Sequence, residues 1–362
     1  MAQVGPTGLG LQSANPQPPV VKALDKARPL LKVHDLKTYF EVGAGLKLLK
    51  GARVEVRAVD GLSFEVFRGE TVGLVGESGC GKTTVGRTLL RLEEATGGEI
   101  VFEGANVTRA KGQQLKDYRR KIQVIFQDPF SSLNPRMTIG QILREPLDIY
   151  NEGPSAQRSR MVTDLLSRVG LAPRYSHTYP HQLSGGQRQR VGIAAALALE
   201  PELIVADEPV SALDLSVQAQ ILNLLARLQQ EYGLSFLLIS HDLGVVRHFS
   251  DRVAVMYLGR IVEMAPTEEL FVNPRHPYTQ ALLASIPQPD PRLRADPLPL
   301  AGEPPSPLDP PAGCHFHPRC PHAMPRCREH SPPHYDVAAG HYASCFLLDQ
   351  TPAAAAAGGI PG

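Results

Sequence analysis

A glycine-rich octapeptide constrains this chain more than any other feature. Residues 76–83 read Gly-Glu-Ser-Gly-Cys-Gly-Lys-Thr and follow an apolar run at 71–75. The spacing G-x-x-x-x-G-K-T predicts a loop whose backbone N–H groups surround phosphates, between a buried strand and a helix over 82–92. Lys82 would reach the β- and γ-phosphates of a nucleotide, and the Thr83 hydroxyl would ligate Mg²⁺. The loop therefore predicts an α/β nucleotide-binding fold.

Other positions of this loop are also expected to contact the nucleotide. Apart from Lys82 and Thr83, they are Gly76, Ser78, Gly79, Gly81 and Thr84. Cys80 has two interpretations: a redox-sensitive thiol, or a small residue that fills a tight turn.

Two acids follow another apolar run. Residues 203–206 read Leu-Ile-Val-Ala and are followed by Asp207 and Glu208. A carboxylate at the end of a buried strand is costly unless it binds a partner, and Mg²⁺ suits Asp207. Because side chains alternate along a strand, Glu208 would point elsewhere and could activate water as a general base.

The remaining pattern alternates short apolar runs with helical periodicity. Strands are expected at 122–126, 203–206, 236–239 and 253–256, and helices over 138–170, 187–199 and 217–231. This alternation predicts a parallel sheet covered on both faces. Strand-like residues at 31–33 and 54–66, separated by a loop at 43–50, predict an antiparallel sheet before the phosphate loop.

Composition argues against several classes of protein. The 37 basic and 36 acidic residues give a net charge of +1, without the basic excess typical of nucleic-acid binding, so no nucleic-acid partner is expected. No apolar stretch approaches the ~18–20 residues that span a bilayer, and the first 20 residues do not resemble a signal peptide. We therefore expect a cytoplasmic protein that reaches a membrane only through a partner.

Residues 183–187 narrow the family. They read Leu-Ser-Gly-Gly-Gln, within YPHQLSGGQRQRVGIAAALALEPELIVADEP, and resemble the signature of ABC ATPases. The resemblance extends over about residues 30–284. It implies that two cassettes hold ATP between them, with Ser184, Gly185, Gly186 and Gln187 of one subunit facing the phosphate loop of the other.

The same resemblance assigns further positions. Gln127 matches the glutamine that senses the γ-phosphate and contributes to the Mg²⁺ site, and His241 matches the histidine that contacts the γ-phosphate. The loop ending at Asp214 would cross the dimer interface. Phe40 is the first choice for stacking on adenine, and Tyr39 is the second. Ala195 departs from the family, which usually carries arginine there.

Three segments resemble the oligopeptide and dipeptide importers of this family. They are QDPFSSLNPRM at 127–137, NPRHPYTQAL at 273–282, and the tail segment AGCHFHPRCPHAMPRC. The resemblance implies ATP-driven peptide uptake at the cytoplasmic face of the membrane. It also implies two permease subunits, a second ATPase subunit, identical or sister, and an extracytoplasmic binding protein. Import of nickel or another small solute stays open, as does a soluble ABC ATPase outside transport.

The tail cysteines suggest a metal centre. Cys314, Cys320, Cys327 and Cys345 follow the spacing C-x5-C-x6-C-x17-C. Four thiolates can hold a [4Fe–4S] cluster or a zinc ion. Reduced cysteines without metal are the third interpretation, and His315, His317 and His322 are possible alternative ligands.

The expected organisation has four parts. Residues 1–28 form a disordered lead, 29–285 the ABC ATPase domain, 286–350 a proline-rich, cysteine-containing extension, and 351–362 a disordered tail. Within the P-loop NTPase fold, we expect a mixed sheet core, an antiparallel β subdomain and an α-helical subdomain that carries the signature.

Overall fold

The structure is a computed structural model that describes residues 28–42, 54–128, 132–286 and 302–350. The expected lead before residue 28, the loop at 43–50, most of the proline-rich strap and the tail at 351–362 lie outside the described residues, as do residues 129–131 of the 127–137 segment.

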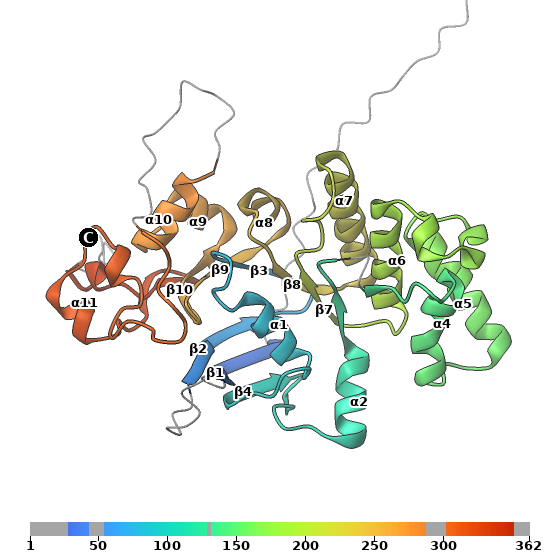
Figure 1. The fold of residues 1–362 in the computed structure, drawn as a ribbon, viewed down its shortest axis with the longest axis horizontal. Helices are drawn as coiled ribbons and strands as arrows, with labels where there is room; N and C mark the ends of the chain where they lie inside the picture. The colour runs from blue at the N-terminus through green and yellow to red at the C-terminus, as the bar shows by residue number, and fades with distance from the viewer. Residues whose placement is uncertain (1–27, 43–53, 129–131, 287–301, 351–362) are drawn as a thin grey trace, which may run out of the picture.

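An eight-stranded mixed sheet forms the centre of the molecule (Figure 1). Its strand order is β11-β12-β10-β9-β3-β8-β7-β6. Neighbouring strands from β9 to β6 are parallel, whereas β9–β10, β10–β12 and β12–β11 are antiparallel. The bounds are β3 Thr71–Val75, β6 Ile122–Ile125, β7 Leu203–Asp207, β8 Ser235–Ile239, β9 Arg252–Tyr257, β10 Arg260–Pro266, β11 Tyr335–Ala338 and β12 His341–Ala343. The predicted mixed sheet is confirmed.

A second sheet is antiparallel and has the order β2-β1-β4-β5. Its strands are β1 Leu31–Val42, β2 Val54–Val66, β4 Gly97–Phe102 and β5 Ala105–Asn106. One apolar core joins Leu36 of β1 and Leu62 of β2 to Val85 and Leu89 of helix α1 (Lys82–Leu89). Helix α1, which follows the phosphate loop, therefore packs between the second sheet and the central sheet.

Helices cover the other face of the central sheet. Figure 1 shows α7, α8, α9 and α10 on the side opposite α1 and the second sheet. They span α7 Leu215–Tyr232, α8 Leu243–Phe249, α9 Thr267–Val272 and α10 Pro277–Ala284. α7 buries Ile221, Leu225 and Leu228 along one face, as its periodicity predicts.

A helical subdomain lies at one end of the molecule. It contains α4 (Ile139–Ile149), α5 (Ser155–Arg168) and α6 (Gly185–Leu197), whereas α2 (Gly112–Lys121) precedes β6. Thr138 begins α4 with a reciprocal capping box: its hydroxyl accepts from the Gln141 N–H, and the Gln141 side chain accepts from the Thr138 N–H. Ser184 begins α6 in the same way.

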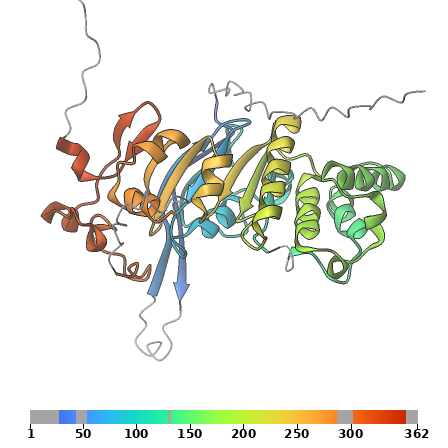
Figure 2. The same cartoon turned by 90° about the horizontal axis from the view of Figure 1, so that it is seen from above.

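The C-terminal extension occupies the opposite end, as Figures 1 and 2 both show. It contains the 3-10 turns His317–Arg319 and Phe346–Gln350, helix α11 (Pro325–Glu329) and strands β11 and β12. β12 pairs with β10 through Glu263↔Ala343 and Met264↔Tyr342. The extension therefore shares the central sheet with the preceding residues, and a boundary near residue 286 stays a prediction about chain organisation.

Candidate nucleotide-binding site

The phosphate loop lies between β3 and α1, as the sequence predicts. Gly76 and Gly81 have φ values of 155° and 108°. A Cβ at Gly76 would lie 2.2 Å from the carbonyl oxygen of Met256, and one at Gly81 would lie 2.0 Å from that of Ala58. Both neighbours are backbone atoms that cannot move aside, so the close packing of the loop requires glycine at these two positions.

Lys82 folds back over this loop. Its Nζ donates to the carbonyl oxygens of Gly76 at 2.7 Å and Glu77 at 3.0 Å, and the residue is buried. Ser78, Gly79 and Thr83 are exposed, while Thr84 is half-buried. The structure therefore places a cation inside the loop, with Ser78, Gly79 and Thr83 open to solvent and Gly76 buried.

Cys80 is buried beside Lys82, with 3.8 Å between Sγ and Nζ. Burial raises the pKa of this thiol, and the neighbouring Lys82 opposes the shift. A buried, protonated thiol is a poor nucleophile, which favours the interpretation of Cys80 as a residue that fills the turn.

Thr83, Gln127 and Asp207, the expected Mg²⁺ ligands, line one cleft of about 480 Å³. β7 ends at Asp207, and the Thr83 hydroxyl lies 3.3 Å from Asp207 Oδ1. Burial raises the pKa of Asp207, while the hydrogen bond from Thr83 opposes the shift. A bound cation would stabilise the ionised carboxylate, so these oxygen donors fit Mg²⁺.

Glu208 contacts two other residues that the sequence predicts for catalysis. Its φ of 47° lies in the left-handed region, which residues other than glycine seldom adopt. The Gln127 amide donates to Glu208 Oε2 at 2.8 Å, and His241 Nδ1 lies 2.9 Å from Oε1. Strained backbone often marks a functional site, and here it brings a carboxylate, an amide and an imidazole together.

The signature and the Asp214 loop form one surface. Ser184 Oγ accepts from the Gln187 N–H at 3.3 Å, and Asp214 Oδ1 accepts from the Val217 N–H at 3.0 Å. A Cβ at Gly186 would lie 2.6 Å from Val217 Cγ1, while one at Gly185 would touch Leu213. The surface lies at the N-terminal ends of α6 and α7. It is separated from the phosphate loop, which follows β3 nearer the middle of the sheet (Figure 1).

The two adenine-stacking candidates differ in their surroundings. The Tyr39 hydroxyl donates to Asp60 Oδ1 at 2.5 Å, and its side chain lines a cavity of about 370 Å³ beside the extension. Thr38, which precedes it, lies 3.0 Å from Thr88 of α1. Alternation along β1 places Phe40 on the same face as Thr38. The alternation predicts that Phe40 faces α1, across a register shift between β1 and β2 at Thr38 and Tyr39, whereas Tyr39 has another partner.

Comparisons with known proteins agree with this geometry. The family described as ABC transporter matches residues 59–211, and the family described as Oligopeptide/dipeptide transporter, C-terminal region, matches residues 262–327. The oligopeptide transport ATP-binding protein AppF of Bacillus subtilis is 51% identical over 321 residues, which cover 88% of this chain and 97% of the relative. This chain belongs to the ABC transporter ATP-binding proteins. The probable peptide ABC transporter ATP-binding protein y4tS of Sinorhizobium fredii is 52% identical over 90% of this chain and 92% of its own.

Solved structures support the same assignment. A dimeric post-hydrolysis state of the ATP-binding cassette MJ0796, bound to ADP and Pi, has a TM-score of 0.58. It is 29% identical and covers 66% of this chain and 98% of its own. The cbiO1 structure from Clostridium perfringens, part of the cbiONQ transporter complex, has a TM-score of 0.58 at 26% identity and covers 68% of this chain and 91% of its own. The protein is an ABC ATPase, with the predicted fold. Among its described residues, no helix is long and apolar enough to cross a membrane.

The four tail cysteines of this ABC ATPase line one pocket. His317 and His322 line it as well, whereas His315 lies elsewhere, with Nδ1 3.1 Å from the carbonyl oxygen of Leu258. Burial, with a smaller contribution from neighbouring thiols, raises the pKa of Cys314 and of Cys345 to about 11. Within the described ranges, no three His, Cys, Asp or Glu side chains form a group that could hold a metal ion.

Two contacts of the phosphate loop, one with α10 and one with the extension, were missed in the sequence. The Glu77 N–H donates to the Tyr278 hydroxyl at 2.9 Å. The Arg319 guanidinium binds both carboxylate oxygens of Glu77, at 2.7 and 3.1 Å. Tyr278 and Arg319 lie in segments that served above only as family markers, HPYTQ and HPRC. The resemblance of both segments to peptide importers was the available signal, but it did not reveal which residue Tyr278 and Arg319 contact.

Proposed function

We propose that this ABC ATPase powers the uptake of dipeptides or oligopeptides by a membrane transporter. The observation that carries the proposal is the match of residues 262–327 to the C-terminal region of oligopeptide/dipeptide transporters. Relatives named as oligopeptide or peptide transport ATP-binding proteins, which align along most of this chain, support it.

A transport assay with the assembled complex tests the substrate. The ATPase, its permeases and binding protein are placed in lipid vesicles, and ATP hydrolysis is measured with dipeptides, pentapeptides, Ni²⁺ or a glycoside. We expect peptides to stimulate hydrolysis and to accumulate. Stimulation by Ni²⁺ or a glycoside alone would instead favour the alternative that the same ATPase serves another small solute. Failure to co-purify with permeases would favour a soluble ABC ATPase.

In the proposed reaction, Glu208 is the general base that polarises the attacking water. Gln127 and His241 hold its two carboxylate oxygens and orient it. His241 and Gln127 then contact the γ-phosphate side of the bound nucleotide, and Lys82 neutralises developing charge on the transferred phosphoryl group.

Thr83, Asp207 and Gln127 would hold Mg²⁺. When bound, the ion supplies positive charge against the β- and γ-phosphate oxygens. The chain's own contribution is the partly buried Asp207 carboxylate, which Thr83 orients. In addition, Phe40 would stack on adenine from the α1 side.

We further propose that two cassettes, identical or sister subunits, close around ATP. Ser184, Gly185, Gly186 and Gln187 of one subunit would face the phosphate loop of the other. Leu215, directly after Asp214, is 83% exposed, which suits a surface that another subunit covers. ATP held between both halves would then favour closure.

The membrane subunits would dock beside Gln127. The cleft that contains Gln127 also has apolar walls formed by Leu90, Val124 and Phe126, of which Phe126 is 47% exposed. An exposed aromatic residue next to a γ-phosphate contact suits a partner that must respond to the nucleotide. The chain would thus work peripherally, at the cytoplasmic face of the membrane.

The tail cysteines are proposed as ligands of a [4Fe–4S] cluster, with zinc as the alternative. The four thiols that line one pocket have the chemistry of a cluster's donor set. In the described ranges no three of them are grouped closely enough to hold a metal ion, so their side chains would have to draw together around the cluster. The test is the absorption spectrum and the iron and sulfide content of anaerobically purified protein. Cys320→Ser should abolish the visible absorption, while the control Cys80→Ser should retain it. Colourless protein with one zinc, or without metal, would contradict the cluster.

A further inference from the structure

The phosphate loop contains a glutamate, Glu77, although this loop has to bind the negatively charged triphosphate of ATP. Glu77 is the second residue of the loop, and its carbonyl oxygen accepts from Lys82 Nζ at 3.0 Å. An unpaired carboxylate here would oppose the approach of a triphosphate, because like charges repel strongly where protein excludes water. The side chain of Glu77 is 22% exposed, so solvent screens it only partly.

The extension supplies the opposite charge. The Arg319 guanidinium binds the Glu77 carboxylate through two parallel hydrogen bonds of 2.7 and 3.1 Å, a geometry that lysine cannot reproduce. The Arg319 side chain is 5% exposed and its guanidinium carbon lies 5.9 Å from the centroid of the Tyr257 ring. This arginine is therefore fixed in place by its surroundings.

The turn that carries Arg319 is built on the core of the ATPase. Phe316 is 1% exposed and packs against the rings of Tyr257 and Tyr278, with centroids 5.3 and 5.4 Å apart. Tyr278 in turn accepts the backbone N–H of Glu77. The aromatic cluster therefore connects the extension to Glu77 in two ways. Tyr278 binds the Glu77 backbone, and Arg319, held next to the cluster, binds the Glu77 side chain.

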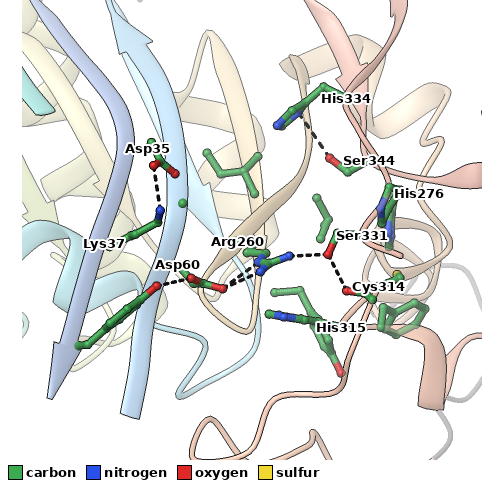
Figure 3. Close-up of a pocket in the computed structure, with 18 residues that line it drawn as sticks. Asp35, Lys37, Asp60, Arg260, His276, Cys314, His315, Ser331, His334 and Ser344 are labelled. Carbon is green, nitrogen blue, oxygen red and sulfur yellow. Dashed lines mark hydrogen bonds and ion pairs between the residues drawn. The ribbon is translucent and has the colours of Figure 1, made fainter. Parts of the chain in front are cut away.

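A second set of contacts holds the extension from the other side. Arg260 of β10 binds Asp60 of β2 and donates to Ser331 Oγ at 2.9 Å, and Ser331 Oγ donates to the carbonyl oxygen of Gly313 at 2.9 Å (Figure 3). Gly313 precedes Cys314 and the turn that contains Arg319. The extension is therefore docked by contacts that do not involve the phosphate loop.

We propose that Arg319 is a positioning residue for ATP: by neutralising Glu77 it removes a negative charge from the phosphate loop, so that tight nucleotide binding requires the docked extension. The inference rests on ATP binding at this loop and adds a role for the extension. It predicts that ATP binding weakens in Arg319→Ala because the Glu77 carboxylate is left unneutralised, and not because the Arg319 side chain itself is missing.

Four variants of the full-length chain test this. ATP affinity is measured by calorimetry in EDTA, at low and high salt, so that no hydrolysis occurs and the phosphates carry their full charge. Arg319→Ala should weaken binding at least fivefold at low salt, and added salt should reduce the difference because it screens charge. Glu77→Gln should bind ATP as tightly as the unaltered chain or up to about threefold more tightly. The double variant Glu77→Gln/Arg319→Ala should return to within about twofold of the unaltered chain.

Arg326→Ala is the matched control. Arg326 pairs with Asp349 at 2.6 Å within the extension and does not contact Glu77, so ATP affinity should change less than twofold. Thermal unfolding of each variant identifies loss of folding. If Arg319→Ala does not fold, Glu77→Gln and the double variant still decide the question.

The proposal is overturned if Arg319→Ala folds and binds ATP as the unaltered chain does, if the double variant stays as weak as Arg319→Ala, or if Glu77→Gln itself weakens binding fivefold. Failure of the unaltered chain to bind ATP would instead contradict the proposed nucleotide site.

Discussion

Glu208 and His241 face each other across the ends of adjacent parallel strands, with 2.9 Å between Oε1 and Nδ1. Glu208 directly follows β7, and His241 follows β8 after one serine. Because the carboxyl ends of parallel strands meet at one edge of the sheet, residues 33 positions apart become direct neighbours.

Glu208→Gln should separate ATP binding from hydrolysis. The amide keeps the shape of the side chain but cannot accept a proton, so hydrolysis should fall about 10²–10⁴-fold while ATP affinity stays unchanged. Phosphate release and nucleotide binding measure the two properties, and gel filtration with ATP should detect a trapped dimer. Glu231→Gln, which alters an exposed ion pair with Arg227, is the control. Rapid turnover by Glu208→Gln would refute the base assignment.

Ser184 caps helix α6 and is also proposed to contact ATP across the cassette interface. A matched pair of variants can distinguish these two roles. Ser184→Ala removes a capping box and should lower the free energy of unfolding by about 1 kcal/mol. Thr138→Ala removes the same type of cap from α4 in the same subdomain, at a similar cost. Hydrolysis by the assembled complex should fall in Ser184→Ala and persist in Thr138→Ala. Equal activity of the two variants would contradict a role of Ser184 across the cassette interface.

Asp207 should give stability an identifiable dependence on pH. Burial raises its pKa above the value in the unfolded chain, so the folded apo protein binds this proton more tightly. Its contribution is therefore complete below the ordinary pKa of aspartate and is lost as the pH rises through the raised pKa. Mg²⁺ needs the ionised carboxylate, so stabilisation by Mg²⁺ and ATP should follow the opposite trend.

Unfolding temperatures with and without Mg²⁺ and ATP, from about pH 4 to 8, measure both trends. In Asp207→Asn, the unfolding temperature without Mg²⁺ and ATP should no longer fall as the pH rises through this range. The variant should also lose most of the stabilisation by Mg²⁺. Identical pH profiles for Asp207→Asn and the unaltered chain would argue against this account.

Phe40 and its neighbour provide a further comparison. Phe40→Ala should weaken ATP binding by roughly tenfold, since stacking between a base and an aromatic ring contributes about 1–3 kcal/mol. Tyr39→Phe removes the hydrogen bond to Asp60 and should leave ATP affinity nearly unchanged. Titration with ATP and with inorganic triphosphate measures the effect, because triphosphate lacks the base. A larger loss in Tyr39→Ala, which removes the second candidate ring, would reverse the assignment.

The sequence predicted the helices and strands that are determined by neighbouring residues in the chain. The strand at Thr71–Val75, the helix that begins at Lys82 and the strand that ends at Asp207 follow from short apolar runs beside turn or polar residues. The contact of Glu208 with Gln127 and His241 needed the order of the strands, which periodicity alone does not give. The resemblance to ABC ATPases supplied that order.

The extension could not be derived in this way. β11 and β12 have four and three residues, too few to show a clear alternation, and dense prolines favoured an extended strap. The Arg319–Glu77 pair joins positions 242 residues apart. Neither residue has a local pattern that reveals its partner, so the neutralised charge in the phosphate loop became visible only in the folded structure.

Pairing of β12 with β10 has a consequence for synthesis of the protein. The edge of β10 acquires its partner only after the ribosome has translated residues 341–343, near the end of the chain. Until then the nascent cassette carries an unpaired strand edge, the type of surface on which chains associate wrongly. A premature stop codon shortly before residue 341 should thus yield a product that cellular proteases and chaperones recognise, even though every nucleotide contact would already have been translated.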